Sequence, residues 1–460
     1  MKLDNAQLAE WDKEYVWHPF TQMQTWNAAD TLIIERGEGC YLIDVLGNRY
    51  LDGTSSLWVT VHGHAHPILT QAIKDQVDKI AHSTLLGLAN VPSIQLAKKL
   101  VEITPSGLTK VFYSDAGATA VEIALKIAFQ YWQQHIDPQQ RKKKKFISLE
   151  KAYHGDTVGT ISVGGKGSVY TTYQDLLFEG YRVPSPYCYR CPLGQEQDQC
   201  QFACLQVVED IMAEHHPEIG AMIIEPLVQG AAGMIMAPVG YLKKIRELCI
   251  KYNILMIADE VAVGFGRTGT LFACEQEEVN PDIMCLAKGL TGGYLPLAAT
   301  LTTETIYQAF LGETRECKTF FHGHTFTGNP VGCAVALANI EVIEQTQLIQ
   351  HIQDLAQILS SGLEKFKSLS HVGNIRQRGL MVGIELVRNK QTKEPYTLEE
   401  TIGHQVISEA RRHGLIIRPS GNVIVLMPVL AISEDQLQQV ISITYEAIKN
   451  VTEGSGNEQE

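Results

Sequence analysis

The sequence predicts an α/β protein with a mostly parallel sheet, together with a smaller α+β domain formed from both ends of the chain. Short, nearly continuous apolar runs alternate with helical patterns between about residues 95 and 340, as is typical of buried parallel strands joined by crossover helices. Residues 31–61 contain short alternating runs with turn residues between them, which predict a meander. Residues 345–450 alternate long helical patterns with two strand-like runs.

The elements follow one another in a simple order. The predicted strands of the central region are KVFYS (110–114), KFISLE (145–150), AMIIEP (221–226), ILMIADE (254–260) and DIMCLAK (282–288). The clearest helical patterns there cover 117–132 and 240–253, and the later strand-like runs cover 375–386 and 423–428. We therefore divide the chain into an N-terminal part of the small domain (1–65), a large domain (66–340), a C-terminal small domain (341–450) and a disordered polar tail (451–460).

Composition and charge exclude several classes of protein. The net charge of −13 over 460 residues argues against a nucleic-acid or anionic-membrane partner. The sequence shows no apolar run of membrane-spanning length and no apolar signal core, so we expect a cytoplasmic protein. Without a secretory signal, the ten cysteines predict reduced thiols rather than a disulfide framework.

The most informative stretch, residues 254–295, contains two predicted strands that end in charged residues. One ends at Asp259 and the other at Lys288, before a glycine-rich turn. The carboxyl ends of parallel strands open into a shared ligand crevice, so the two side chains should meet there. A lysine after a strand is by itself more often a surface cation. Paired with an acid it predicts a pyridoxal-phosphate (PLP) site, in which the lysine amine condenses with the cofactor aldehyde and later moves a proton, while the carboxylate holds the pyridine nitrogen protonated.

These residues lie in a stretch that resembles the class III (subgroup II) aminotransferases. DEVAVGFGRTG and PDIMCLAKGLTGGYLP carry the resemblance, and SDAGATAVEIALKIA, KAYHGDT, IIEP and HTFTGNP follow the same family in order. The resemblance covers nearly the whole chain. It implies the PLP fold type I architecture, with seven strands in the sheet of the large domain, and an amino-transfer reaction.

The resemblance also implies roles for individual residues. Gly117 and Ala118 would bind the cofactor phosphate at the start of a helix, where free N–H groups and the helix dipole favour an anion; the family often has serine at the position of Ala118. Tyr153 would stack on the cofactor ring. Thr325 would reach the phosphate of a neighbouring subunit, so the active site would be shared within a homodimer. Next to it in the sequence, Gly323 would contact the substrate and His324 the cofactor.

Further segments resemble the members of the class that act on the biotin precursor 8-amino-7-oxononanoate. They are WHPFTQM, SSLWVTVHGHAHP, ALKIAFQYW and IIRPSGNVIVLMP. The resemblance implies that Arg418 binds the terminal carboxylate of the keto substrate, for which a guanidinium is well suited. Phe20, Leu57 and Trp58, together with Tyr153, would line the substrate pocket. Relatives that use glutamate carry a glutamate where this chain has Ala231, and a further arginine that residues 422–428 lack.

The amino donor is left open between S-adenosylmethionine and lysine. Users of adenosylmethionine usually have a tyrosine at the position of Phe20 and often a tryptophan at that of Leu57. The alternatives for the whole chain are another class III enzyme, such as an ω-amine:pyruvate aminotransferase or an aminomutase, and a thiol metal-binding protein on an inactive scaffold. Cys188, Cys191, Cys200 and Cys204 motivate the last of these, but their spacing is short for a zinc knuckle and we expect no metal there. We also expect none at His62, His64 and His66.

Overall fold

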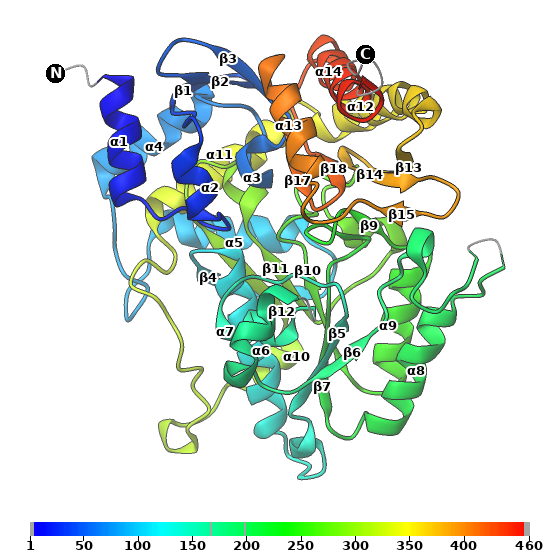
Figure 1. Ribbon diagram of the computed structural model, residues 1–460. Helices are drawn as coiled ribbons and strands as arrows, with labels where there is room; N and C mark the ends of the chain where they lie inside the picture. Colours follow the sequence, from blue (N-terminus) through cyan, green and yellow to red (C-terminus); the bar gives the residue numbers. More distant parts are fainter. Residues whose placement is uncertain (1–3, 166–167, 197–198, 455–460) are drawn as a thin grey trace.

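The computed structural model describes residues 4–165, 168–196 and 199–454. A central sheet with helices on both faces forms the lower part of the molecule in Figure 1, and the C-terminal elements lie above it, on the same side as both chain ends. The architecture is the α/β fold that the sequence predicts.

The sheet of the large domain contains seven strands, and all but one run parallel. Its order is β4-β12-β11-β10-β7-β5-β6, and only β12 runs antiparallel to its neighbours. The strands are β4 (Leu108–Ser114), β5 (Lys145–Leu149), β6 (Tyr181–Val183), β7 (Ile219–Ile224), β10 (Leu255–Asp259), β11 (Ile283–Leu286) and β12 (Ala298–Thr303). A mostly parallel seven-stranded sheet is therefore confirmed.

Helices cover both faces of this sheet. Along β10, Ile257 packs in one cluster with the apolar side of α6, whereas Met256 and Ala258 pack in a second cluster with residues of α5 and α9. Both faces are buried, which explains the continuous apolar runs in the sequence. The helices of this region are α4 (Pro67–Lys79), α5 (Val91–Ile103), α6 (Gly117–Gln133), α7 (Val158–Val163), α8 (Ala203–His215), α9 (Tyr241–Lys251), α10 (Glu304–Gln308) and α11 (Pro330–Gln345).

The two ends of the chain meet in sheets outside the large domain. The predicted meander forms β1 (Ile34–Glu38), β2 (Tyr41–Asp44) and β3 (Arg49–Asp52), and β3 pairs in parallel with β16 (Leu415–Ile416) from the C-terminal part. A second sheet has the order β13-β14-β18-β17, with β15 paired to β14. Its strands are β13 (Val372–Arg378), β14 (Met381–Asn389), β15 (Glu394–Pro395), β17 (Arg418–Ser420) and β18 (Val423–Leu426).

The remaining elements complete the flanks. They are α1 (Asn5–Tyr15), α2 (Met23–Ala28), α3 (Ser55–Trp58), β8 (Val228–Gln229), β9 (Ile235–Met236), α12 (Leu348–Leu363), α13 (Ile402–Arg412) and α14 (Glu434–Glu453). The domain boundary expected at residue 340 falls inside α11. Helix α14 extends three residues into the tail that we expected to be disordered, and residues 455–460 lie outside the described residues.

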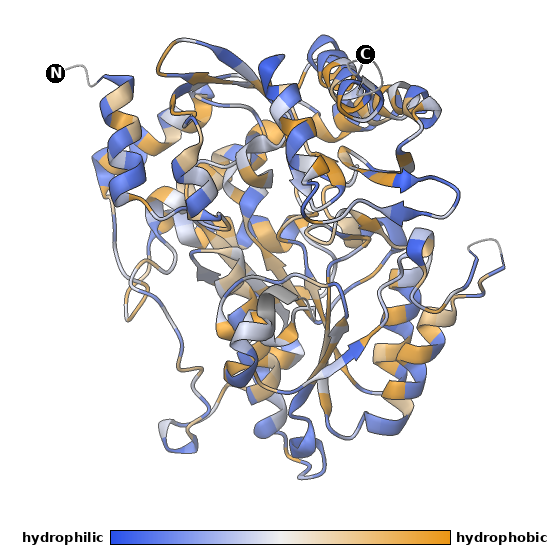
Figure 2. Ribbon diagram, in the orientation of Figure 1, coloured by the Kyte–Doolittle hydropathy of each residue, from blue (hydrophilic) through white to orange (hydrophobic). Residues whose placement is uncertain are grey.

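The peripheral helices are amphipathic. In Figure 2, α8 and α9 carry alternating orange and blue, as expected for helices with one face on the core and one in water. Within the described segments, no helix combines the length and the apolar composition that crossing a bilayer requires.

A buried asparagine on α11 holds the turn that carries Lys288. The side chain of Asn339 has no exposed surface, and its Nδ2 donates to the carbonyl oxygens of Gly289 and Leu290 at 2.9 and 3.1 Å. The backbone carbonyl of Asn339 also lies 3.2 Å from Nε2 of His62. Asn339 on helix α11 thereby connects the turn after β11 to the segment that follows α3.

We expect Asn339→Leu to lower the free energy of unfolding by about 1–3 kcal/mol, because two buried carbonyl groups would lose their donor. Urea unfolding followed by circular dichroism measures this change. Glu341→Ala, at an exposed position of the same helix, is the control and should change stability by less than about 0.5 kcal/mol. Equal midpoints for the two variants would contradict the assigned role.

Candidate active site

Asp259 and Lys288 lie at neighbouring ends of two parallel strands, as the sequence predicts. Strands β10 and β11 pair in parallel, with Asp259 opposite Cys285. Lys288 follows three residues later, at the start of a short 3-10 turn (Lys288–Thr291), and has a backbone φ of +42°. Left-handed backbone is uncommon for residues other than glycine and is found at functional sites. The pairing of the two strands therefore brings the acid and the amine to one edge of the sheet.

The Asp259 carboxylate is buried and held by two donors. It is 5% exposed; its Oδ2 lies 2.7 Å from Nδ1 of His154, and its Oδ1 accepts from the Val261 N–H at 3.1 Å. His154 is also buried, and its Nε2 has no hydrogen-bond partner in the described part of the chain. These contacts fix the position of the carboxylate at the strand end.

The environment of Lys288 favours a neutral amine. Burial lowers the pKa of Lys288 to about 8, although Asp259 and Glu225 act in the opposite direction. The ammonium nitrogen lies 4.8 Å from the ring centroid of Trp58. A lysine that loses its proton near neutral pH is suited to nucleophilic attack on a carbonyl group.

The start of α6 packs closely against Val261, two residues after Asp259. The helix begins at Gly117, and a Cβ atom added there would lie 2.6 Å from a methyl group of Val261. A Cβ on Gly155 would lie 2.5 Å from the Cβ of Ala118. Free N–H groups at a helix start bind phosphate, so a lysine, an acid and an anion site lie together, and this set of groups fits PLP.

Tyr153 and His324 join the same region from two other segments. The backbone N–H of Tyr153 donates to Glu225 at 3.1 Å, and its hydroxyl donates to Asp156 at 2.7 Å. Nδ1 of His324 lies 2.5 Å from a carboxylate oxygen of Asp115, two residues before Gly117. The segment that contains Thr325 therefore passes close to the start of α6.

The residues predicted to bind substrate are more exposed than this core. Phe20 is 73% exposed and Leu57 is 46% exposed, and Gly323 and Thr325 are also exposed. The sequence favours an inward-facing side chain at Arg418, whereas Arg418, which begins the edge strand β17, is exposed. The hydroxyl of Ser420 on this strand donates to the carbonyl of Ala231, which keeps β17 against the turn at residues 229–231.

Trp58 lies over Lys288 at the end of a strained loop. Ser55, Ser56 and Trp58 have φ values of +51°, +60° and +65°. The fully buried Asp52 accepts from the backbone N–H of Ser56 with both oxygens, at 2.9 and 2.8 Å, and lies 3.0 Å from Nε2 of His64. Strain of this kind persists only where surrounding contacts maintain it.

Three buried charged residues of this region were not predicted as site residues: Asp52, Arg267 and Glu225. Asp52 holds the loop before Trp58 through the N–H of Ser56. Arg267 donates to the carbonyl oxygens of Thr60 and Pro428 at 2.8 and 2.6 Å, and burial lowers its pKa to about 9. Glu225 directly follows β7, the other neighbour of β10. A strand-end acid in IIEP was the signal that could have identified Glu225.

The cysteine and histidine clusters do not form a metal site in the segments that the structure describes. No group of three or more His, Cys, Asp or Glu side chains there is placed to hold a metal ion. Burial, and after it the neighbouring cysteines, raise the pKa values of Cys188 and Cys204. His62 and His64 have protein partners of their own, Asn339 and Asp52.

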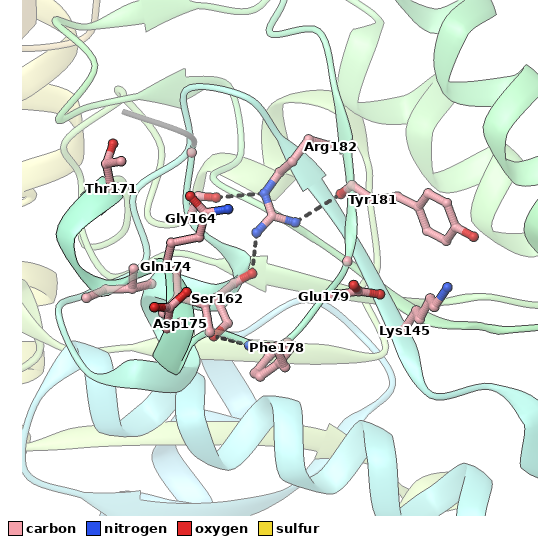
Figure 3. Close-up of a pocket in the computed structure, with 14 residues that line it drawn as sticks. Lys145, Ser162, Gly164, Thr171, Gln174, Asp175, Phe178, Glu179, Tyr181 and Arg182 are labelled. Atoms are coloured by element: carbon pink, nitrogen blue, oxygen red, sulfur yellow. Dashed lines mark hydrogen bonds between the residues drawn. The ribbon is translucent and has the colours of Figure 1, made fainter. Parts of the chain in front are cut away.

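A separate cavity of about 620 Å³ lies beside the edge strand β6. Figure 3 shows Arg182 in its wall, with the guanidinium bonded to the carbonyl oxygens of Gly164, Tyr181 and Ser162. None of the residues predicted to act in catalysis lines this cavity. The guanidinium supports the local backbone.

Comparison with known proteins gives a consistent result. The family model "Aminotransferase class-III" matches residues 23–448. The adenosylmethionine-8-amino-7-oxononanoate aminotransferase of Geobacter sulfurreducens is 51% identical over 98% of this chain and 99% of its own. The crystal structure of the enzyme of that name from Methanocaldococcus jannaschii has a TM-score of 0.92 at 48% identity and covers 97% of this chain and 99% of its own. An omega transaminase from Pseudomonas jessenii in complex with PMP has the same TM-score at 34% identity, covering 98% and 100%.

We expect the amine of Lys288 in the apoprotein to be half neutral at a pH of about 8. Because Asp259 raises this pKa, Asp259→Asn should move the transition to lower pH. The measurement is the labelling rate of Lys288 by an amine-reactive reagent as a function of pH, with peptides quantified by mass spectrometry. Exposed Lys79 is the internal reference, and identical profiles for the two lysines would contradict the assigned environment.

Proposed function

Because the chain belongs to the class-III aminotransferases, it is a PLP-dependent transaminase, and we propose that it converts 8-amino-7-oxononanoate to 7,8-diaminononanoate in biotin biosynthesis. The observation that carries the proposal is the name of the relatives that align over nearly the full chain at about half identity. The omega transaminases are less similar, at 34% identity. The amino-oxononanoate substrate is therefore favoured over a simple amine.

The residues at the strand ends would supply the amine and the acid. Bound PLP supplies an aldehyde that takes up amino groups and a ring that accepts electrons. Lys288 would hold the cofactor through Nζ and then move the proton at the substrate carbon, which its lowered pKa supports. Asp259, oriented by His154, would keep a proton on the ring nitrogen. Tyr153 would cover one face of the ring and exclude water.

Two anion sites would fix the positions of the cofactor and of the keto substrate. Backbone N–H groups at Gly117 and Ala118 would bind the phosphate, which their place at the start of α6 supports. At the other end, Arg418 would bind the terminal carboxylate of the keto substrate through two parallel hydrogen bonds. The chain has Ala231 where relatives that use glutamate carry a glutamate, which supports a donor other than glutamate.

We propose S-adenosylmethionine as the amino donor because the relatives are named for it. Lysine is the second candidate. Phe20 lacks the hydroxyl that a tyrosine would offer to the nucleoside, and Leu57 replaces an aromatic side chain. Both residues are exposed at the outer edge of the site, so the partner subunit would have to complete the donor pocket around them.

The proposal includes a homodimer and a cytoplasmic location. In it, Thr325, with Gly323 and His324, reaches the phosphate site of the other subunit. The exposed apolar side chains of Leu86, Leu88 and Phe326 support burial against a second copy. A biosynthetic enzyme with ten cysteine thiols suits a reducing compartment.

The deciding experiment incubates the purified holoenzyme with the keto substrate and either adenosylmethionine or lysine, with mass spectrometric detection of 7,8-diaminononanoate. We expect product with adenosylmethionine. If product forms with lysine and not with adenosylmethionine, lysine is the amino donor, and the proposed amino acceptor, 8-amino-7-oxononanoate, is unchanged. Turnover of simple amines with pyruvate, and no diaminononanoate with either donor, would contradict the proposed reaction. The variant Lys288→Ala should lose the visible absorption of the bound cofactor.

We expect Arg418→Ala to raise the KM for 8-amino-7-oxononanoate by about 10- to 100-fold, because charge-assisted hydrogen bonds to the carboxylate would be lost. The KM for the donor should change much less. Steady-state kinetics with each substrate varied in turn separates the two effects. Arg412→Ala, which removes only an exposed ion pair with Glu409, is the matched control. Equal effects on both substrates would argue against a carboxylate clamp.

A further inference from the structure

Glu225 occupies a place in the site that matches Asp259 on the next strand. Strands β7 and β10 are parallel neighbours, with Ile224 opposite Ala258, so the residue that follows each pair is an acid. Glu225 is 6% exposed and belongs to no role assigned above. A buried carboxylate is costly unless hydrogen bonds satisfy it, so its partners show what it stabilises.

The two carboxylate oxygens of Glu225 hold two different parts of the site. Oε1 accepts from the backbone N–H of Tyr153 at 3.1 Å, and Oε2 accepts from the backbone N–H of Gly230 at 3.0 Å. Tyr153 belongs to the segment proposed to cover the cofactor ring. Gly230 belongs to the turn that Ser420 ties to β17, the strand of Arg418.

Gly230 in turn lies against Trp58. A Cβ atom added to Gly230 would be 3.2 Å from Cζ3 of the indole, so the backbone of the turn approaches the ring closely. The same ring lies over the Lys288 amine. The strained loop before Trp58 cannot hold the indole by backbone preference, so neighbouring contacts must do so.

We propose that Glu225 is a positioning residue that couples the cofactor side of the active site, through Tyr153, to the substrate side, through Gly230 and Trp58. This inference rests on the proposed roles of Lys288 and Tyr153. A glutamine in its place has one carbonyl oxygen, so it could keep only one of the two N–H donors and would turn an NH₂ group toward the other. The link between the two sides would then be broken.

The charge of Glu225 also acts on the reacting amine. The charged and titratable groups that face it are His154, Asp259 and Lys288, and Arg267 acts on Lys288 in turn. Burial raises the pKa of Glu225 to about 7, and His154 and the two backbone donors oppose that shift. Above this pH, the carboxylate favours a protonated nitrogen on Lys288.

The chain contains a matched control in Glu260. It directly follows β10, has no exposed surface, and accepts backbone N–H bonds from Ala273 and Cys274 at 2.9 and 2.8 Å. Its pKa is also raised to about 7, chiefly by burial. Its two partners belong to a segment that carries none of the proposed chemistry. Neutralising Glu260 therefore reproduces the loss of a buried carboxylate without touching Tyr153 or Gly230.

The test compares the holoenzymes of Glu225→Gln and Glu260→Gln. We expect a similar fall in melting temperature for both. Only Glu225→Gln should move the pH titration of the cofactor's visible absorption to lower pH, because only that variant removes a negative charge that acts on Lys288. Only Glu225→Gln should lower kcat/KM, by about 10- to 100-fold. Equal titrations and equal kinetics for the two variants would overturn the proposal.

A second variant tests the link from its other end. Gly230→Ala should press on Trp58 and raise the KM of the amino substrates with little change in the absorption titration, because no charge is removed. If Glu225→Gln fails to fold, Gly230→Ala still tests the coupling between the two sides of the site. Unchanged kinetics in Gly230→Ala would overturn that coupling. The absorption titrations need no particular acceptor, so they report on Glu225 even if the wild-type enzyme proves inactive with 8-amino-7-oxononanoate.

Discussion

The parallel pairing of β10 with β11 is the constraint on which the rest of the site depends. It sets Asp259 beside the end of β11, and the backbone of the following turn then brings Lys288 back toward the acid. Neither side chain could reach this place from an isolated strand. Asn339 on α11 holds the turn, and both faces of the sheet are buried under helices, so the separation of amine and acid is set by close packing rather than by the two side chains themselves.

Burial makes the charge balance of the site as important as its geometry. Asp52, Glu225 and Asp259 are buried together with His154 and Arg267, and Lys288 is half-buried beside them. Each carboxylate accepts two or more hydrogen bonds, several of them from backbone N–H groups, and these bonds hold the carboxylates in place. Burial lowers the pKa of Lys288 to about 8, although Asp259 and Glu225 act in the opposite direction. The fold therefore keeps the acids ordered and leaves the amine ready to lose its proton.

The outer part of the pocket is organised differently. Phe20, Leu57, Thr325 and Arg418 are exposed in the single chain, whereas Trp58 follows a strained loop that Asp52 holds and lies against the turn at Gly230. Buried, ordered residues around Lys288 together with exposed residues at the predicted substrate positions would suit an enzyme that accepts two chemically different substrates in turn. A second subunit that packs against these exposed side chains would bury them.

The sequence by itself determined the fold class, five of the seven strands of the central sheet (β4, β5, β7, β10 and β11) and the adjacency of Asp259 and Lys288. Those features follow from local periodicity and from the rule that parallel strand ends share an edge. The resemblance implied a phosphate site at Gly117 and Ala118, and the structure places Gly117 at the start of α6. The roles predicted for Tyr153, Thr325 and Arg418 came from resemblance and stay predictions.

Only the tertiary structure decided which buried charges meet. Glu225 contacts Tyr153 and Gly230, Arg267 contacts Thr60 and Pro428, and Asp52 contacts Ser56 and His64. Several of these partners are far apart in sequence, and no periodicity encodes the distance between them. The exposure of Arg418 was likewise decided by the folded position of β17. Hydrogen bonds act over about 3 Å, so their pairing depends on the folded positions of whole strands and turns.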